Sequence, residues 1–132
     1  MNQKEVVSRL TALGATLALL AVAVGAFGAH ALKARLQATN MQQVYETGVQ
    51  YHMYHALGIL VTALFAQTMP ANKKLFYTAG LLFAVGILLF SGSLYLLAVL
   101  NIKLLGIITP FGGICFLAGW AVLIRAAVTN ER

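Results

Sequence analysis

Long stretches of apolar residues, separated by short polar segments, constrain this sequence more than any other feature. Four such blocks follow one another, at about residues 10–29, 44–68, 75–100 and 105–127. Each is long enough to cross a bilayer as a helix, which takes about 20 apolar residues. Because unpaired backbone groups are excluded from lipid, this pattern predicts helices. We therefore expect an all-α integral membrane protein, a four-helix bundle that forms a single domain over residues 1–132.

The composition supports this class and argues against nucleic-acid binding. The chain is 61% hydrophobic and 9% charged, whereas a soluble domain has about 25% charged residues. Its net charge is +6, but the basic residues are scattered at the ends of the apolar blocks, where they suit lipid head groups. Cys115 is the single cysteine. It therefore indicates neither a disulfide framework nor a cysteine-based metal site, and it fits a small buried hydrophobe.

The first block has the layout of a secretory signal peptide. Lys4 and Arg9 precede it, and Ala29-His30-Ala31 mimics a cleavage site. Its apolar run is longer than the usual hydrophobic region of a signal peptide, so we expect a retained first span.

The connection after the first block contains a possible short helix. Leu32 and Leu36 lie four residues apart, with Lys33 and Arg35 beside them. This spacing fits a short amphipathic helix on the membrane surface. A polar loop explains the segment equally well.

Basic residues are unequally divided between the two faces of the expected bundle. With four spans, both termini lie on the same side as the turn between the second and third blocks. Six of the nine basic residues fall on that side, namely Lys4, Arg9, Lys73, Lys74, Arg125 and Arg132. The opposite side holds three, namely Lys33, Arg35 and Lys103. The positive-inside rule then places both termini in the cytoplasm.

Small residues recur at helical spacing along the blocks. Helices in lipid associate through close contact at such residues, so we predict that they mediate helix packing. The glycines among them are Gly14, Gly25, Gly28, Gly112 and Gly119. The Gly-x-x-Gly spacing of Gly25 and Gly28 is not a nucleotide-binding loop, because no strand precedes it and no Lys-Ser/Thr follows it.

Polar residues gather in one half of the expected bundle. The second block opens with the polar segment Glu46–His55, and polar groups inside a membrane are costly. With both termini in the cytoplasm, the outer half of the bundle is the half that faces away from the cytoplasm. This half contains the polar segment, the ends of the first and third blocks, and the start of the fourth block. Candidates for a ligand site or polar network are His30, Glu46, Gln50, Tyr51, His52, His55, Ser91, Ser93, Tyr95 and Thr109. We predict that His30, His55 and the Ser91/Ser93/Tyr95 group form one contiguous cluster, because an unpaired polar group costs several kcal/mol.

Several chemistries are possible for this cluster, and most lack a supporting motif. His52 and His55 have a spacing that suits a shared metal, with Glu46 or His30 as further ligands. No His-Glu-x-x-His motif and no second nearby carboxylate accompanies them, so we expect neither a metal nor another cofactor. A proton pathway would need titratable groups across the whole membrane. The inner half of the expected bundle offers none, so we do not expect a proton transporter within one protomer. No serine–histidine–acid set or carboxylate pair indicates an enzyme.

Three hypotheses for the polar cluster remain open. The first is an interhelical hydrogen-bond network that stabilises the bundle. The second is a pocket that binds a lipid head group, a small amphiphile or a partner membrane protein. The third is a small transporter or channel formed by a homo-oligomer, because one bundle of four helices is too narrow for a continuous polar path.

Five segments of the sequence carry a resemblance to a known family. They are Gly25–Leu32, Thr47–His55, Leu89–Tyr95, Ile108–Gly113 and Leu117–Trp120. In this order, over all four blocks, they resemble the YgdD/YwdK-like family of small bacterial inner-membrane proteins of unknown function, which has a small animal transmembrane relative. The resemblance implies a multi-pass protein of the bacterial inner membrane and adds no chemistry. It draws attention to His30, His55, Ser91, Ser93, Tyr95, Thr109 and Pro110.

Overall fold

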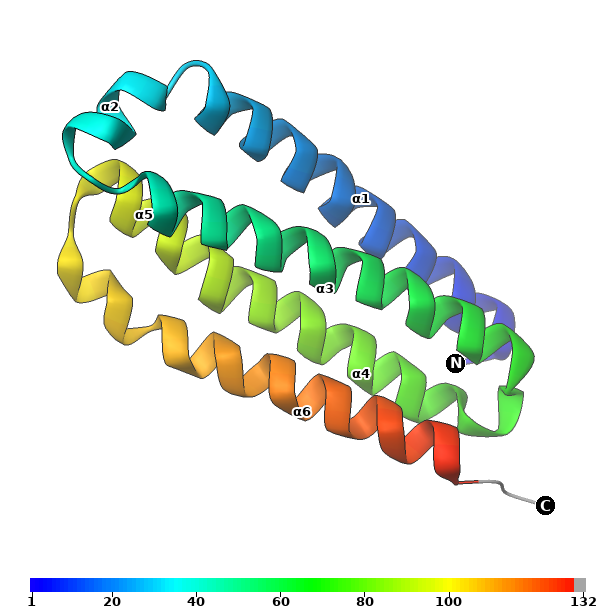
Figure 1. The fold of residues 1–132 in the computed structure, drawn as a ribbon. Helices are drawn as coiled ribbons and strands as arrows, with labels where there is room; N and C mark the ends of the chain where they lie inside the picture. The colour runs from blue at the N-terminus through cyan, green and yellow to red at the C-terminus, as the bar shows by residue number, and fades with distance from the viewer. Residues whose placement is uncertain (130–132) are drawn as a thin grey trace.

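A computed structural model describes residues 1–129, which contain helices and no strand (Figure 1). The longer helices are α1 (Gln3–Ala29), α3 (Gln42–Thr68), α4 (Lys73–Gly86), α5 (Gly92–Leu100) and α6 (Thr109–Val128). The shorter segments are α2 (Lys33–Ala38), the 3₁₀ turns η1 (Pro70–Asn72) and η3 (Lys103–Ile107), and the π-helical turn η2 (Ile87–Ser91). The expected all-α class is thus confirmed for these residues, and the short helix expected after the first block is α2.

Helix α1 begins seven residues before the apolar block that predicted it. The Asn2 side chain accepts a hydrogen bond from the Glu5 backbone N–H, and the Glu5 carboxylate accepts one from the Asn2 N–H, both at 2.9 Å. This capping box satisfies N–H groups that the first helical turn leaves free. The helix therefore starts in a polar stretch, and Gln3 donates to the Ala66 and Gln67 carbonyls at the end of α3.

The segments α4, η2 and α5 form one continuous rod, in agreement with the third apolar block. A π turn accommodates an extra residue and rotates the helix face that follows it. Asn101 ends the rod in a left-handed conformation with φ 56°, which asparagine tolerates better than most residues. The fourth block begins as η3, and α6 starts only at Thr109, with Pro110 in its first turn.

Within residues 1–129, three helical segments are long and apolar enough to cross a membrane, namely Gln3–Ala29, Pro70–Leu100 and Lys103–Val128. Helix α3 is as long as α1, at 27 residues, or roughly 40 Å at 1.5 Å per residue. Its first half carries Gln42, Gln43, Glu46 and Gln50, which lower its mean hydropathy.

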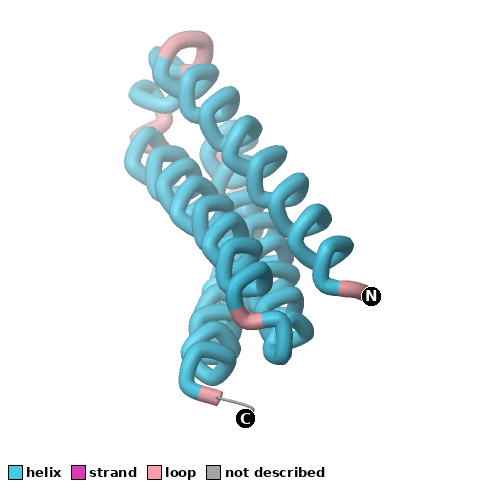
Figure 2. The backbone as a smooth tube through the Cα atoms, turned by 90° about the vertical axis from the view of Figure 1, so that its right-hand side faces the viewer, coloured by secondary structure: helices cyan, strands magenta, loops and turns pink. Residues whose placement is uncertain are grey.

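The long elements lie side by side in chain order: α1 packs on α3, α3 on α4, and α4 on α6 (Figure 1). The start of α1 and the end of α6 lie at the same end of the molecule, and α2 lies at the opposite end (Figures 1 and 2). The main core contains Leu10, Ile59, Phe76 and Phe83, which are fully buried. A smaller cluster around Leu36 lies beneath α2.

Glycines allow the helices to approach closely. An added Cβ atom would come within 3.1 Å of a neighbouring helix at Gly14, Gly25, Gly28, Gly112 and Gly119. The three in α1 face α3, and the two in α6 face the α4–η2 part of the rod. At Gly28 the added atom would enter the Tyr45 ring, and at Gly112 it would meet the backbone of Phe90.

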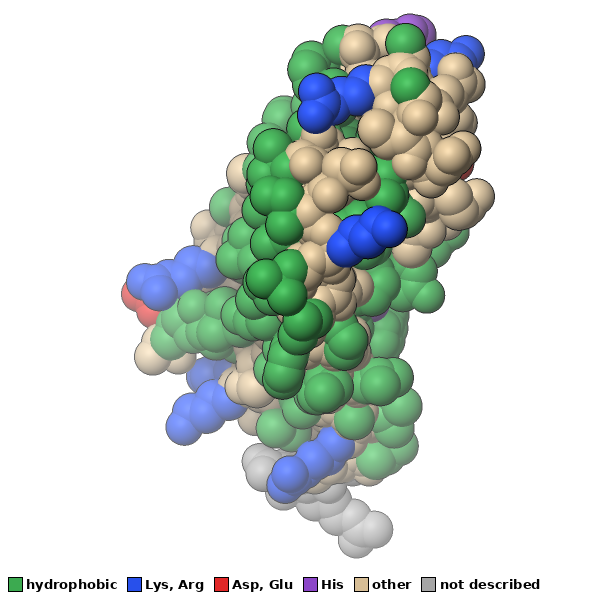
Figure 3. All heavy atoms as spheres, turned by 90° about the vertical axis from the view of Figure 1, so that its left-hand side faces the viewer, with side chains coloured by type: hydrophobic (Ala, Val, Ile, Leu, Met, Phe, Trp, Pro, Cys, Tyr) green, Lys and Arg blue, Asp and Glu red, His purple; other side chains and the backbone are tan. Residues whose placement is uncertain are grey.

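Much of the outer surface is hydrophobic. Leu88, Leu104 and Leu117 are each 70% exposed or more. Figure 3, which views the end that carries α2, shows hydrophobic side chains over much of the visible surface, with Lys and Arg side chains scattered among them. A monomeric soluble protein rarely exposes apolar surface on this scale, so this surface is suited to lipid or to a partner.

Candidate functional site

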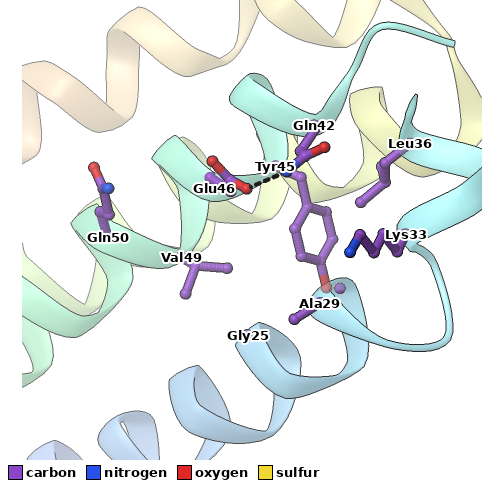
Figure 4. A pocket seen from close by; sticks show the side chains of 10 residues that line it. Gly25, Ala29, Lys33, Leu36, Gln42, Tyr45, Glu46, Val49 and Gln50 are labelled. Carbon is purple, nitrogen blue, oxygen red and sulfur yellow. Dashed lines mark hydrogen bonds between the residues drawn. The ribbon is translucent and has the colours of Figure 1, made fainter. Parts of the chain in front are cut away.

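A polar pocket lies where α1 ends and α3 begins, beneath α2 (Figure 4). We call it the interfacial pocket. It has a volume of about 330 Å³. Its lining residues are Gly25, Gly28 and Ala29 of α1, Lys33 and Leu36 of α2, and Gln42, Tyr45, Glu46, Val49 and Gln50 of α3. The pocket thus combines one cation, one carboxylate and two amides with an apolar floor.

The two charges of this pocket are not paired with each other. Lys33 extends from α2 toward the Tyr45 ring, and Glu46 projects from α3 (Figure 4). Among the described residues, the hydrogen bond to the Glu46 carboxylate comes from the Gln42 amide, at 2.8 Å. Both charges are therefore available to a ligand that carries the opposite charges.

Tyr45 fixes the floor of the pocket. Its hydroxyl donates to the Val24 carbonyl of α1 at 2.7 Å, and its side chain is 4% exposed. The ring lies against Gly28 and near Tyr95, at a centroid distance of 5.3 Å. The pocket is consequently held open by packing between α1, α3 and α5, so a ligand need not reorganise it.

A second hollow, the central groove, runs between α3 and α6. It has a volume of about 470 Å³ and is mostly apolar. Its lining residues are Tyr51, His55, Phe90, Pro110, Gly113, Ile114, Phe116, Leu117 and Trp120. His55 lies 13 residues from each end of α3 (55 − 42 and 68 − 55), so the groove reaches the middle of the helix.

His55 is locked in one tautomer. Its Nδ1 lies 2.8 Å from the Tyr51 carbonyl, and its Nε2 lies 3.1 Å from the Trp120 indole nitrogen. A carbonyl only accepts and an indole N–H only donates, so Nδ1 carries the proton and Nε2 carries the lone pair. The ring also stacks on Phe116, at 3.5 Å between centroids. Both nitrogens are thus occupied, and the neutral imidazole joins α3 to α6.

His52 faces a different part of the molecule. Its Nδ1 lies 3.0 Å from the Tyr95 hydroxyl, while its Nε2 has no hydrogen-bond partner among the described residues. Ser91 is also buried, and no hydrogen bond that meets the same distance and angle criteria reaches its hydroxyl within residues 1–129. Both side chains are at least 95% buried.

The hydrogen bonds of the residues expected to form one cluster fall into separate pairs. His52 pairs with Tyr95, and His55 pairs with Trp120. Ser93 and Thr109 form a separate pair at 2.7 Å. Positions three apart on a helix differ in direction by about 60°, so the two histidines face different neighbours.

His30 also departs from the expectation. It caps the C-terminus of α1, and its side chain is exposed and makes no hydrogen bond within the described part of the chain.

The predicted site residues thus fall into different places. Glu46 and Gln50 line the interfacial pocket, and Tyr51 and His55 line the central groove.

The sequence did not lead us to propose four residues that line these two sites, namely Lys33, Gln42, Tyr45 and Trp120. Trp120 offered a signal, because an indole N–H inside an apolar block requires an acceptor.

The donor sets of these sites limit their chemistry. Within residues 1–129, no three His, Cys, Asp or Glu side chains gather closely enough to hold a metal ion. Neither His52 nor His55 hydrogen-bonds to a serine, threonine or cysteine there. The arrangement is therefore suited to holding a ligand by charge, amide and apolar contacts.

Comparison with known proteins identifies the family. Residues 24–113 match the family model DUF423, described as a protein of unknown function. The chain belongs to this family. It is 52% identical to the membrane protein YwdK of Bacillus subtilis over 116 residues, which is 88% of this chain and 93% of that protein. These comparisons confirm the resemblance stated from the sequence.

Other relatives are also described as membrane proteins. The membrane protein SERP0230 of Staphylococcus epidermidis is 46% identical over 88% of this chain and 92% of its own. The inner membrane protein YgdD of Escherichia coli is 41% identical over 84% of this chain and 82% of its own. No solved structure matches the chain. The family and the apolar helices together indicate a multi-pass membrane protein.

Proposed function

We propose that this protein is a non-enzymatic membrane protein that binds a zwitterionic amphiphile in its interfacial pocket. The ligand class is a lipid whose head group joins a phosphate to a primary ammonium. The observation that carries the proposal is the unpaired combination of Lys33 and Glu46 in one preformed pocket. Lys33 would bind the phosphate and Glu46 the ammonium.

The depth of the pocket supports a head group in this position. Glu46 is nine residues from His55, the midpoint of α3. At 1.5 Å per residue this is about 13.5 Å, close to half the thickness of the hydrocarbon core, which is about 15 Å. Head groups begin at that depth. Val49 and Gly25 continue the pocket toward the middle of the helix and would contact the acyl chains.

The other half of the protein supports binding over transport. Toward the termini, the buried polar side chains among residues 1–129 are Thr62 and Asn72. Thr62 donates to the Ile59 carbonyl, and Asn72 donates to the Ala126 and Thr129 carbonyls. Because these groups are already satisfied by the backbone, they offer no polar path through one protomer.

We further propose that α3 is a fourth span, so that both termini face the cytoplasm of a bacterial inner membrane. The distribution of basic residues supports this orientation. A reporter enzyme that is active only in the periplasm is expected to stay inactive when it is fused to the C-terminus. The same reporter inserted after Asn101 should be active. Activity of the C-terminal fusion alone would contradict the proposed orientation.

Substitutions in the pocket should change lipid selectivity. Native mass spectrometry of the purified protein, with equal amounts of phosphatidylethanolamine and phosphatidylglycerol, is expected to show preferential retention of phosphatidylethanolamine. Glu46→Gln should remove this preference, because an amide cannot neutralise an ammonium. Lys33→Gln should weaken the binding of both lipids. An exposed ion pair contributes about 0.2–1 kcal/mol, so the expected change is about two- to fivefold.

Lys103→Gln is the matched control, since Lys103 lies at the same end of the molecule outside the pocket. Equal retention of both lipids by the unmodified protein would reject the proposed ligand class. A loss as large in Lys103→Gln as in Lys33→Gln would show that net charge, and not the pocket, determines lipid binding.

A further inference from the structure

One face of α3 carries a heptad repeat that points away from the rest of the protein. Its seven residues are Gln43, Thr47, Gln50, Tyr54, Leu57, Val61 and Leu64, which we call the α3 seam. They are separated by alternating steps of four and three residues, the spacing that brings two helices together in a coiled coil. The seam lies between the interfacial pocket and the central groove. Contacts within the protomer leave it accessible.

Six of the seven seam residues are exposed. Tyr54 is 58% exposed, Leu57 49%, Val61 39% and Leu64 64%. Gln43 and Gln50 are also exposed, and Thr47 is partly buried. The polar half of the seam lies toward α2 and the apolar half toward the termini.

The polar side chains of the seam lack partners of their own. In the described chain, the Gln43 and Gln50 amides and the Tyr54 hydroxyl make no hydrogen bond, and Thr47 bonds to the backbone of its own helix. This step rests on the proposal that α3 is a fourth span. Measured from the midpoint of α3, Gln50 then lies at about 7.5 Å and Tyr54 at about 1.5 Å, well inside the hydrocarbon. An unpaired amide there costs about 2–7 kcal/mol. Acyl chains have no group that could satisfy it.

We propose that the α3 seam binds the α3 seam of a second copy of this chain, in a parallel two-fold dimer. Two copies inserted in the same orientation have parallel α3 helices. A parallel heptad contact then places Gln50 opposite Gln50 of the second copy. An amide has both a donor and an acceptor, so two identical amides can bond to each other. No charged residue lies in the seam, so the two-fold axis brings no like charges together.

The two halves of the seam have different roles in this dimer. Leu57, Val61 and Leu64 supply the interlocking apolar contact. Gln50 and Tyr54 fix the register, as a single polar residue does in soluble coiled coils, because a shifted register would leave them unpaired. The dimer therefore explains why the first half of α3 is polar on the face that would otherwise contact lipid.

Disulfide crosslinking in native membranes tests the contact directly. In a Cys115→Ala background, Leu57→Cys and Val61→Cys leave every polar residue of the seam intact. Oxidation is expected to convert both variants to covalent dimers. Leu88→Cys and Ile124→Cys are matched controls, because these leucine and isoleucine side chains are 70% and 65% exposed on other helices. They should remain monomeric.

A second measurement tests the polar half. Gln50→Leu is expected to weaken dimerisation by about three- to thirtyfold in vesicles diluted with lipid, followed by fluorescence energy transfer between labelled copies. Gln37→Leu, on α2, should have no effect. Crosslinking at residues 57 and 61 no stronger than at 88 and 124 would overturn the proposal, as would crosslinking to a different protein. Gln50 also lines the interfacial pocket, but residues 57 and 61 do not, so this result is independent of lipid binding.

Discussion

Gly112→Ala is expected to destabilise the protein by about 1–3 kcal/mol, the usual cost of an extra methyl group in a tightly packed contact. A Cβ atom at this position would meet the backbone of Phe90 and lie 2.7 Å from its Cα. A side chain can rotate away from such a contact, but a helix backbone cannot. Helix α6 would therefore have to move away from η2, which loosens the contacts around it.

Gly113 provides a control in the next position of the same helix. A Cβ atom added there would be 3.9 Å from the nearest atom of the Phe90 side chain, an ordinary contact. Since alanine is favoured over glycine in a helix by about 1 kcal/mol, Gly113→Ala should be neutral or slightly stabilising. The midpoint of thermal unfolding in mild detergent, followed by circular dichroism, measures both. Equal midpoints for the two variants would show that α6 does not approach η2 this closely.

The helical class and the extent of the rods could be predicted because lipid leaves few alternatives. Apolar length alone indicated α1, the rod from Lys73 to Leu100 and α6. The starts of helices were less predictable. Helix α1 begins at Gln3 because of the Asn2 capping box, which extends it beyond the apolar block. Hydrophobicity does not report such polar caps.

The candidate site was predictable in its residue types and not in its geometry. The sequence indicated that Glu46, Gln50, His52 and His55 were unusual, but not which neighbour each one faces. That depends on the rotation of α3 against the other helices, which is set by close contacts such as Gly28 against Tyr45. The π turn also rotates Ser93 toward Thr109. No local sequence pattern encodes these rotations.

Lys33 illustrates a second limit. Its charge suggested only a membrane-surface helix, because a lysine beside Leu32 and Leu36 is common in amphipathic segments. The interfacial pocket arises when α2 folds over the junction of α1 and α3, held by Leu36 and by a hydrogen bond from Arg35 to the Val99 carbonyl. The residue gains its proposed role from this long-range packing.

His55→Ala is expected to be the most damaging polar substitution, at about 2–5 kcal/mol. It removes a ring that stacks on Phe116 at 3.5 Å, and it leaves the Trp120 N–H without an acceptor. Trp120→Phe keeps an aromatic ring and removes only the donor. It should therefore cost less, about 0.6–2 kcal/mol, the range for hydrogen bonds between membrane helices.

The double variant His55→Phe/Trp120→Phe separates hydrogen bonding from packing. The single variants of this cycle are His55→Phe and Trp120→Phe. With both polar groups replaced, neither side leaves a partner unsatisfied, so the double variant should be more stable than the sum of these two single changes predicts. Thermal unfolding followed by circular dichroism measures the cycle. Trp120 is the single tryptophan of the chain, so its emission reports the loss of the imidazole in His55→Ala. Additive effects in the cycle would show that the two side chains do not interact, and the tautomer assigned to His55 would then lose its basis.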